Sequence, residues 1–283
     1  MFLHPIEWPE GKRCAAAVTF DIDADSLIRN ASPDDADLRL QPVSMGRYGP
    51  TVAVPRILET YRRLGLRQTF FMPGWVMEAY PATVEAILEG GHEIGHHSWC
   101  HEDPMGHSDE REAELFERAL EVHVKMTGRK PRGYRAPVYS LTPPMVDRLI
   151  AHGFLYDSSM MADDLPYQVH RPSGSLIELP PHWGTDDWPP FAHFAEIDYL
   201  MPVRGPSDGI RPFIEELEAA HDAGGFWMAV LHPFLTGRLA RWREMEKHLE
   251  RYAAMSDVWF APLEEIATHA AKTPSALRQE TIG

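Results

Sequence analysis

The chain has 283 residues, of which 44% are hydrophobic and 24% are charged, so it can bury a sizeable core. Its formal net charge of -15 argues against nucleic acid or an anionic membrane as a partner, because both attract basic surfaces. With two cysteines, no long apolar run and no signal-like start, the sequence predicts one domain, residues 1–283, in the cytoplasm.

The first half of the chain alternates short apolar segments with amphipathic ones. Residues 14–20 form an apolar run without a polar stripe, which predicts a buried parallel strand closed by Asp21 and Asp23. Residues 24–50 contain prolines, glycines and alternating charges, and we expect a long loop there that covers the site. The further elements expected in this half are helices over 51–64, 81–89 and 109–126, with strands over 68–72, 93–95 and 132–135.

The second half continues the alternation. The expected strands are 154–157, 176–179, 226–231 and 258–260, with helices over 143–152, 210–223, 238–255 and from 263 onward. An aromatic and acidic loop, residues 180–194, follows one of these strands and is either a substrate-binding wall or a protein contact. Seven or eight short strands that alternate with helices predict an α/β fold, a (β/α)7–8 barrel with a long active-site loop.

Ligand-type side chains are most concentrated in residues 91–103, which hold four histidines and three carboxylates. His97 and His101 are separated by three residues, so both imidazoles can face one side of a turn and bind a divalent cation. This pair alone fits an ordinary polar turn equally well, and a third ligand is needed to decide. We expect His92 and His96 to lie outside the ligand set and Cys100 to be a small buried residue.

Chemically reactive groups recur where the predicted strands end. In a βα-barrel these ends meet at one face, which would gather the following side chains: Asp21, Asp23, His97, Arg135, Asp157 and His232. Asp21 and Asp23 would face the same side of an extended strand. One of them can complete a metal site with His97 and His101, and the other can act as general base, paired with Arg135.

Five short motifs in order carry a resemblance to a known family. They are Thr19-Phe20-Asp21-Ile22-Asp23, His97-Ser98-x-x-His101, Arg135-Ala136-Pro137, Asp157-Ser158 and Leu231-His232-Pro233. As an ordered set over residues 14–233, they resemble the motifs of the polysaccharide deacetylase (NodB-homology) family. The resemblance implies a distorted βα-barrel and a metal-dependent hydrolase of carbon–nitrogen bonds other than peptide bonds, typically acting on an N-acetyl group of a sugar.

The same resemblance implies a role for each motif residue. Asp23, His97 and His101 would be the ligands of a divalent metal, with Zn²⁺ expected first and Co²⁺, Fe²⁺ or Ni²⁺ as alternatives. Asp21 would be the catalytic base and Arg135 its tether. His232 would be the general acid, and Asp157 is assigned as the partner of that histidine.

Departures from the usual motifs bear on the substrate. The first motif reads Asp-Ile-Asp where secreted glycan deacetylases have Asp-Asp-Gly, and it is more similar to an intracellular branch with peptidoglycan-deacetylase-like proteins, cyclic-imide hydrolases and a metal-independent allantoinase. The expected substrate is therefore a sugar amide or a small cyclic amide or imide. A homo-oligomer, for instance a tetramer, is expected from the resemblance. A carbohydrate-binding relative without catalysis is the alternative from another class.

Overall fold

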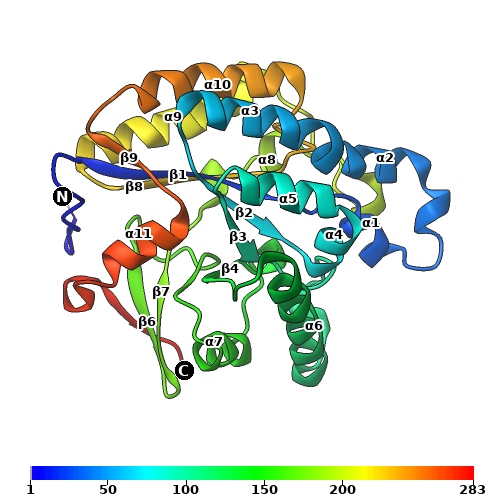
Figure 1. Ribbon diagram of the computed structural model, residues 1–283, viewed down its shortest axis with the longest axis horizontal. Helices are drawn as coiled ribbons and strands as arrows, with labels where there is room; N and C mark the ends of the chain where they lie inside the picture. Colours follow the sequence, from blue (N-terminus) through cyan, green and yellow to red (C-terminus); the bar gives the residue numbers. More distant parts are fainter. Residues whose placement is uncertain (1) are drawn as a thin grey trace.

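A sheet of parallel strands forms the centre of the computed structural model, which describes residues 2–283 (Figure 1). Every residue of β1 (Cys14–Asp21) is buried, because its small and apolar side chains can be covered on both faces of the sheet. In spatial order the parallel strands are β8 (Phe226–Leu231), β1, β2 (Thr69–Met72), β3 (Glu93–His96), β4 (Gly133–Tyr134), β5 (Tyr156–Asp157) and β7 (Gly174–Glu178).

After β7 the chain returns to β8, the strand at the other edge of the parallel set. Asp186 makes an isolated parallel bridge with Val230 of β8, so the curved sheet begins to close on itself. β9 (Val258–Phe260) pairs with β1, while β6 (Tyr167–Arg171) pairs antiparallel with β7 and parallel with β10 (Gln279–Thr281). The predicted α/β fold is confirmed.

Helices cover the outside of this sheet, and in Figure 1 three of them lie above β1 and β8. These three are α3 (Val54–Leu64), α9 (Pro206–Ala223) and α10 (Leu239–Ala253). The other long helices are α5 (Pro81–Glu89), α6 (Asp109–Thr127), α7 (Pro143–Ala151) and α11 (Leu263–Ala270). Of residues 2–283, no helix is long and apolar enough to span a membrane.

Aromatic packing fixes β1 against its covering helices. The ring of Phe20 lies 5.8 Å from the rings of both Phe70 and Trp242, measured between centroids, and Tyr61 donates its hydroxyl to the carbonyl of Val18 at 3.1 Å. Truncation of such a buried aromatic side chain costs about 3–5 kcal/mol. The carboxyl end of β1, where Asp21 stands, is therefore held by a rigid core.

The segment predicted as a long loop, residues 24–50, is mostly helical, and that prediction was wrong. It contains α1 (Ser26–Ala31), the 3-10 turn η1 (Ala36–Leu38) and α2 (Leu40–Tyr48), and it enters α3 through the π-helical turn η2 (Gly49–Ala53). Gly46 allows α2 to approach the backbone of Ala24, because a Cβ at this position would lie 2.5 Å from the Ala24 oxygen. Buried Asp25 anchors the segment by ion pairs to Arg29 and Arg47.

Several further elements were not predicted. They are β6, β10, α4 (Gly74–Ala79) and α8 (Trp188–Phe191). The sequence of β6 alternates buried and partly exposed residues and includes two basic side chains, so it lacks the apolar run of the central strands. β4 and β5 are also shorter than the strands expected over 132–135 and 154–157.

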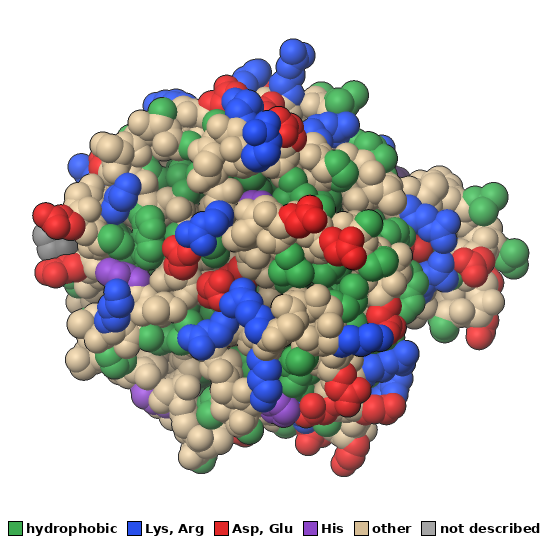
Figure 2. Space-filling view, viewed as in Figure 1, with side chains coloured by type: hydrophobic (Ala, Val, Ile, Leu, Met, Phe, Trp, Pro, Cys, Tyr) green, Lys and Arg blue, Asp and Glu red, His purple; other side chains and the backbone are tan. Residues whose placement is uncertain are grey.

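Charges of both signs are interspersed on the face that Figure 2 shows. Ion pairs of exposed and half-buried side chains include Arg67 with Glu265 at 2.7 Å and Arg129 with Glu264 at 2.8 Å. Exposed pairs of this kind contribute little to stability.

Candidate active site

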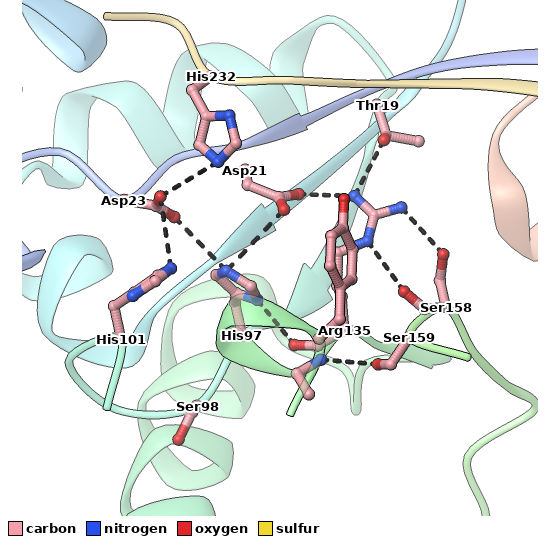
Figure 3. A network of polar contacts seen from close by, with 12 residues as sticks. Thr19, Asp21, Asp23, His97, Ser98, His101, Arg135, Ser158, Ser159 and His232 are labelled. Carbon is pink, nitrogen blue, oxygen red and sulfur yellow. Dashed lines mark hydrogen bonds and ion pairs between the residues drawn. The ribbon is translucent and has the colours of Figure 1, made fainter. Parts of the chain in front are cut away.

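Most of the residues singled out in the sequence meet at the carboxyl edge of the sheet (Figure 3). Asp21 is the last residue of β1 and Asp23 follows two positions later. His97 follows β3 directly, and Arg135 and His232 follow β4 and β8 in the same way. Parallel strands end at one edge, so residues far apart in sequence become neighbours here.

Asp23, His97 and His101 form a buried group. The Nε2 atom of His97 lies 3.4 Å from Asp23 Oδ1, and Nε2 of His101 lies 3.5 Å from Asp23 Oδ2. One ligand-type atom from each side chain lies within 4.8 Å of the others. Four-coordinate zinc with bonds of about 2.0 Å places neighbouring ligand atoms roughly 3.3 Å apart. The spacing of this group therefore fits a small divalent cation.

The hydrogen bonds of the group leave the same atoms free for a metal. Both carboxylate oxygens of Asp23 and the Nε2 atom of His97 are buried and have no hydrogen-bond partner among residues 2–283. The Nδ1 atom of His97 lies 2.7 Å from the carbonyl oxygen of Arg135, so it carries the proton and leaves a lone pair on Nε2. Burial acts to raise the pKa of Asp23, but the nearby imidazoles outweigh it and lower the pKa. The residues present fit a metal.

A carboxylate that the sequence analysis did not single out shapes the loop between the two histidines. Ser98 and His101 both have positive φ, at 58° and 57°, which is uncommon for residues other than glycine. Glu102 accepts hydrogen bonds from the Ser98 hydroxyl at 2.8 Å, the Trp99 amide at 3.0 Å and the Cys100 amide. Its place directly after the second histidine was the only signal in the sequence.

Arg135 is completely buried and holds Asp21. Its Nη1 donates to Asp21 Oδ1 at 2.6 Å and to the hydroxyl of Thr19 at 3.0 Å. Burial acts to lower the pKa of the guanidinium, but the Asp21 carboxylate beside it reverses the direction and raises the pKa. The other oxygen of Asp21, Oδ2, lies 4.0 Å from Nε2 of His97 and so faces the candidate metal group.

His232 faces the same group from β8, but its partner is Asp187 and not Asp157, so that prediction was wrong. The Nδ1 atom of His232 lies 2.6 Å from Asp187 Oδ1, and its Nε2 lies 3.4 Å from Asp23 Oδ2. Burial acts to lower the pKa of His232, yet the Asp187 carboxylate raises it to about 10. The imidazole is therefore held as a cation with Nε2 directed at the site.

Asp157 lies elsewhere because β5 ends beside β7 and not beside β8. Its carboxylate accepts a hydrogen bond from the Ser159 hydroxyl at 2.9 Å, and its register partner is Glu178. The signal that would have identified the true partner was the adjacent pair Asp186-Asp187 before Trp188, within the loop left open between a substrate wall and a protein contact.

Two histidines of the dense stretch stay outside the group, as predicted. The Nε2 atom of His96 lies 3.2 Å from the Phe116 carbonyl, and Nδ1 of His92 accepts from the Gln68 amide at 3.1 Å. Burial lowers the pKa of both imidazoles, to about 3 for His96 and about 4 for His92. They are neutral packing residues.

A cavity of about 370 Å³ opens onto Asp21, His97, His101 and His232. Its wall is largely aromatic and apolar and comes from the following residues: Leu27, Ala31, Val138, Tyr139, Trp183, Trp188, Ile197 and Tyr199. The ring of Trp183 meets Tyr139 edge-on at 5.0 Å, and the Tyr139 hydroxyl donates to Asp186. The segment 180–194 and helix α1 both line this cavity.

The polysaccharide deacetylase family model matches residues 48–156. The chain is similar to the crystal structure of a Mycobacterium smegmatis protein assigned to the polysaccharide deacetylases, with 36% identity, a TM-score of 0.93 and coverage of 99% of this chain and 96% of that one. It is 27% identical to a peptidoglycan deacetylase of Helicobacter pylori over 90% of this chain and 96% of that protein.

The fold is also similar to that of Puue allantoinase, with a TM-score of 0.79, 21% identity and coverage of 94% of this chain and 93% of the other. At this level of identity the likeness concerns the fold alone.

The fold and the edge of the sheet define an α/β protein that gathers carboxylate, imidazole and guanidinium groups around one cavity. The chain belongs to the polysaccharide deacetylase family, and the resemblance inferred from its motifs is confirmed. Membership of this family implies hydrolysis of an amide bond.

Proposed function

We propose that the protein is a metal-dependent hydrolase of a non-peptide amide bond. The observation that carries this proposal is the set of buried, unpartnered ligand atoms on Asp23 and His97 beside the carboxylate of Asp21. Asp23, His97 and His101 would hold the divalent cation, for which Zn²⁺ is the first expectation. When bound, a cation of this kind polarises a carbonyl and lowers the pKa of water.

Asp21 is the proposed general base. One of its oxygens is held by Arg135 at 2.6 Å, which fixes the side chain, and the other faces the candidate metal group. That second oxygen can take the proton from a water molecule as the water oxygen forms a bond to the amide carbon. The carbonyl π electrons then move to the carbonyl oxygen, and the substrate carbon becomes tetrahedral.

His232 is the proposed general acid. Asp187 keeps its imidazole protonated and directs Nε2 toward Asp23 and thus toward the reacting centre. As the carbon–nitrogen bond breaks, the electron pair stays on nitrogen and the Nε2 proton transfers to it. The products are a carboxylic acid and an amine, or one ring-opened molecule when the substrate is cyclic.

The cavity favours a small cyclic amide or imide over a long glycan as the substrate. Trp183, Trp188 and Tyr139 give it an aromatic wall, and α1 covers it from a second side through Leu27. A volume of about 370 Å³ is at the small end of the range for ligand sites. The second candidate is an N-acetyl sugar, which is supported by the deacetylase names of the relatives.

A metal titration followed by a panel of amides tests the proposal. The apoprotein is loaded with Zn²⁺ or Co²⁺ and assayed with N-acetylglucosamine oligomers, succinimide-type rings and hydantoin-type rings. We expect Asp21→Asn to lose about 10²–10⁴-fold in kcat while it still binds the metal. The exposed Asp34→Asn serves as the matched control.

Hydrolysis of the rings alone would assign the small cyclic substrate, and hydrolysis of the sugars alone would assign the deacetylase. If no metal binds, or if Asp21→Asn hydrolyses as fast as the wild type, the proposed mechanism is wrong.

A further inference from the structure

Two carboxylic acids end neighbouring strands behind the proposed base. Asp157 of β5 and Glu178 of β7 are register partners, and neither has any exposed surface. Among residues 2–283, neither carboxyl group forms an ion pair with lysine, arginine or histidine within 4.0 Å. Asp157 Oδ2 and Glu178 Oε2 also have no hydrogen-bond partner in this part of the chain.

Two carboxylates in such a place cannot both be ionised. Burial penalises each charge, and two adjacent negative charges repel each other, so one proton shared by the pair is the stable arrangement. Burial raises the pKa of Asp157 to about 6, and burial together with Asp157 raises the pKa of Glu178 well above its usual range.

The groups that face the pair do not remove the need for this proton. The phenol of Tyr134 comes from β4, the guanidinium of Arg135 from the residue after β4, and the phenol of Tyr167 from β6. Arg135 already forms an ion pair with Asp21, and burial raises the pKa of both tyrosines. The phenols are therefore neutral neighbours.

The pair is connected to the active site through two serines. The Ser159 hydroxyl donates to Asp157, and Glu178 Oε1 accepts the amide of Ser159 at 2.8 Å. Ser158 in turn accepts from Arg135 twice, through its carbonyl at 3.1 Å and its hydroxyl at 2.9 Å. Figure 3 shows the contacts of Ser158 with the Arg135 guanidinium and of that guanidinium with Asp21, and Ser159 beside the backbone amide that follows Arg135.

Ser159 also fixes the backbone that follows the guanidinium, because its hydroxyl accepts from the Ala136 amide at 2.9 Å. The carbonyl of Arg135 then holds Nδ1 of His97 at 2.7 Å. The position of Ser159 therefore bears on both the base and a candidate metal ligand.

We propose that Asp157 and Glu178 share one proton and act as positioning residues, which hold the Ser158-Ser159 segment and, through Arg135, orient the base Asp21. The catalytic part of this inference rests on the proposed amide hydrolase, and the proton-sharing part does not. Asp157, assigned from the sequence as a catalytic residue, does not line the cavity. It would act on Asp21 only indirectly, through Ser159, Ser158 and Arg135.

Glu178→Gln and Glu178→Ala separate the shared proton from the rest of the side chain. Glutamine keeps an oxygen acceptor for Ser159 and offers an N–H donor to Asp157 in place of the shared proton, whereas alanine removes both. We expect Glu178→Gln to keep kcat within about 3-fold and Glu178→Ala to lose about 10–100-fold in kcat with little change in KM. Zn²⁺ affinity should fall in the alanine variant only, because the Arg135 carbonyl that holds Nδ1 of His97 would no longer be fixed in place.

Glu93 provides the matched control. It is another buried acid with a raised pKa, about 7, but it stands at the start of β3, at the amino end of that strand. Glu93→Gln and Glu93→Ala should change stability and leave kcat and Zn²⁺ affinity unchanged.

The dependence of stability on pH tests the proton directly. The folded wild type keeps the shared proton while the unfolded chain releases it above the ordinary pKa of about 4.3, so wild-type stability falls as pH rises toward the raised pKa of the pair. Glu178→Gln lacks this ionisation. Its melting temperature relative to the wild type should therefore rise as the pH increases above about 5.

The outcomes are distinct. A difference in melting temperature that does not change with pH would overturn the shared proton. Equal loss of kcat or Zn²⁺ affinity in Glu178→Gln and Glu178→Ala, or a similar loss in Glu93→Ala, would overturn the positioning role. If the wild type hydrolyses none of the amides, the proposed function fails, and the melting curves and Zn²⁺ titrations still decide this inference.

Discussion

Two groups of acid and histidine side chains stand at the same edge of the sheet, and they differ in how many hydrogen bonds their carboxylates accept. The first group is Asp23, His97 and His101, and the second is Asp186, Asp187 and His232. In the first group, Asp23 has no hydrogen-bond partner for either oxygen among residues 2–283. In the second group, Asp187 accepts from the amide and ring of His232 and from the amide and hydroxyl of Thr236. Both groups have the composition and spacing of a metal site.

The difference shows that composition and spacing do not by themselves define a ligand set. A buried carboxylate whose oxygens are already filled by donors has little to gain from a cation, whereas one with free oxygens needs a charge beside it. We therefore propose that a metal would bind at Asp23, whereas Asp187 raises the pKa of His232. Nε2 of His232 lies 3.4 Å from Asp23, which brings the two groups into one site.

The largest expected effect comes from breaking the first group. Asp23→Asn keeps the size of the side chain but removes its charge, and we expect Zn²⁺ affinity to fall by more than about 100-fold and hydrolysis to drop to background. Calorimetric titration of the apoprotein with Zn²⁺ measures the affinity. Asp187→Asn is the matched control, since it makes the same change in the second group and should bind Zn²⁺ like the wild type. Equal losses in the two variants would make both groups ligands.

The sequence was most informative where a short apolar strand ends in a reactive side chain. Asp21 ends β1 and Asp23 comes two residues later, while His97 and His232 follow β3 and β8. The apolar runs of β1 and β8 make the positions of these two strands clear, and the structure brings all four side chains together. Parallel pairing alone accounts for this, because it aligns the strand ends whatever the loops do.

The partner of His232 could not be obtained in the same way. Asp157 follows an apolar strand and so matched the pattern, but β5 ends next to β7, far along the sheet from β8. Asp187 lies in an irregular segment whose path depends on a single bridge, from Asp186 to Val230. The helices of residues 24–50 were missed for a related reason, since they depend on tertiary contacts such as the hydrogen bond that the Tyr80 hydroxyl donates to Asp25.

An intermediate effect on hydrolysis is expected when Asp187 of the second group loses its negative charge. Asp187→Asn removes the carboxylate that raises the pKa of His232 to about 10, and we expect kcat to fall about 10²–10³-fold. The imidazolium is the acid form, so wild-type activity should fall only as pH rises through that high pKa. In the variant the alkaline limb should move to lower pH. A pH profile of kcat/KM measures this shift, and an unmoved limb would show that His232 is not the acid.

The smallest effect should come from removing one donor to Asp187. Thr236 is fully buried and donates its hydroxyl to this carboxylate, so Thr236→Val should destabilise the fold by about 1.5–3 kcal/mol and lower kcat only a few-fold. The amide of Thr236 and both contacts of His232 remain, which is why the catalytic loss is small. Urea unfolding and steady-state assays measure the two quantities.

The control for this variant is Thr60→Val, another buried threonine whose hydroxyl donates to a carboxylate, that of Glu246, at 2.8 Å. Thr60 lies on α3, outside the cavity, so Thr60→Val should leave kcat unchanged. It should lower stability at least as much, because the buried indole N–H of Trp242 also loses its acceptor, the Thr60 hydroxyl at 3.0 Å. If both variants lost kcat in proportion to stability, the hydrogen bonds of Asp187 would serve the fold alone. A loss of kcat confined to Thr236→Val would show that filling the oxygens of Asp187 also sets the acid strength of His232.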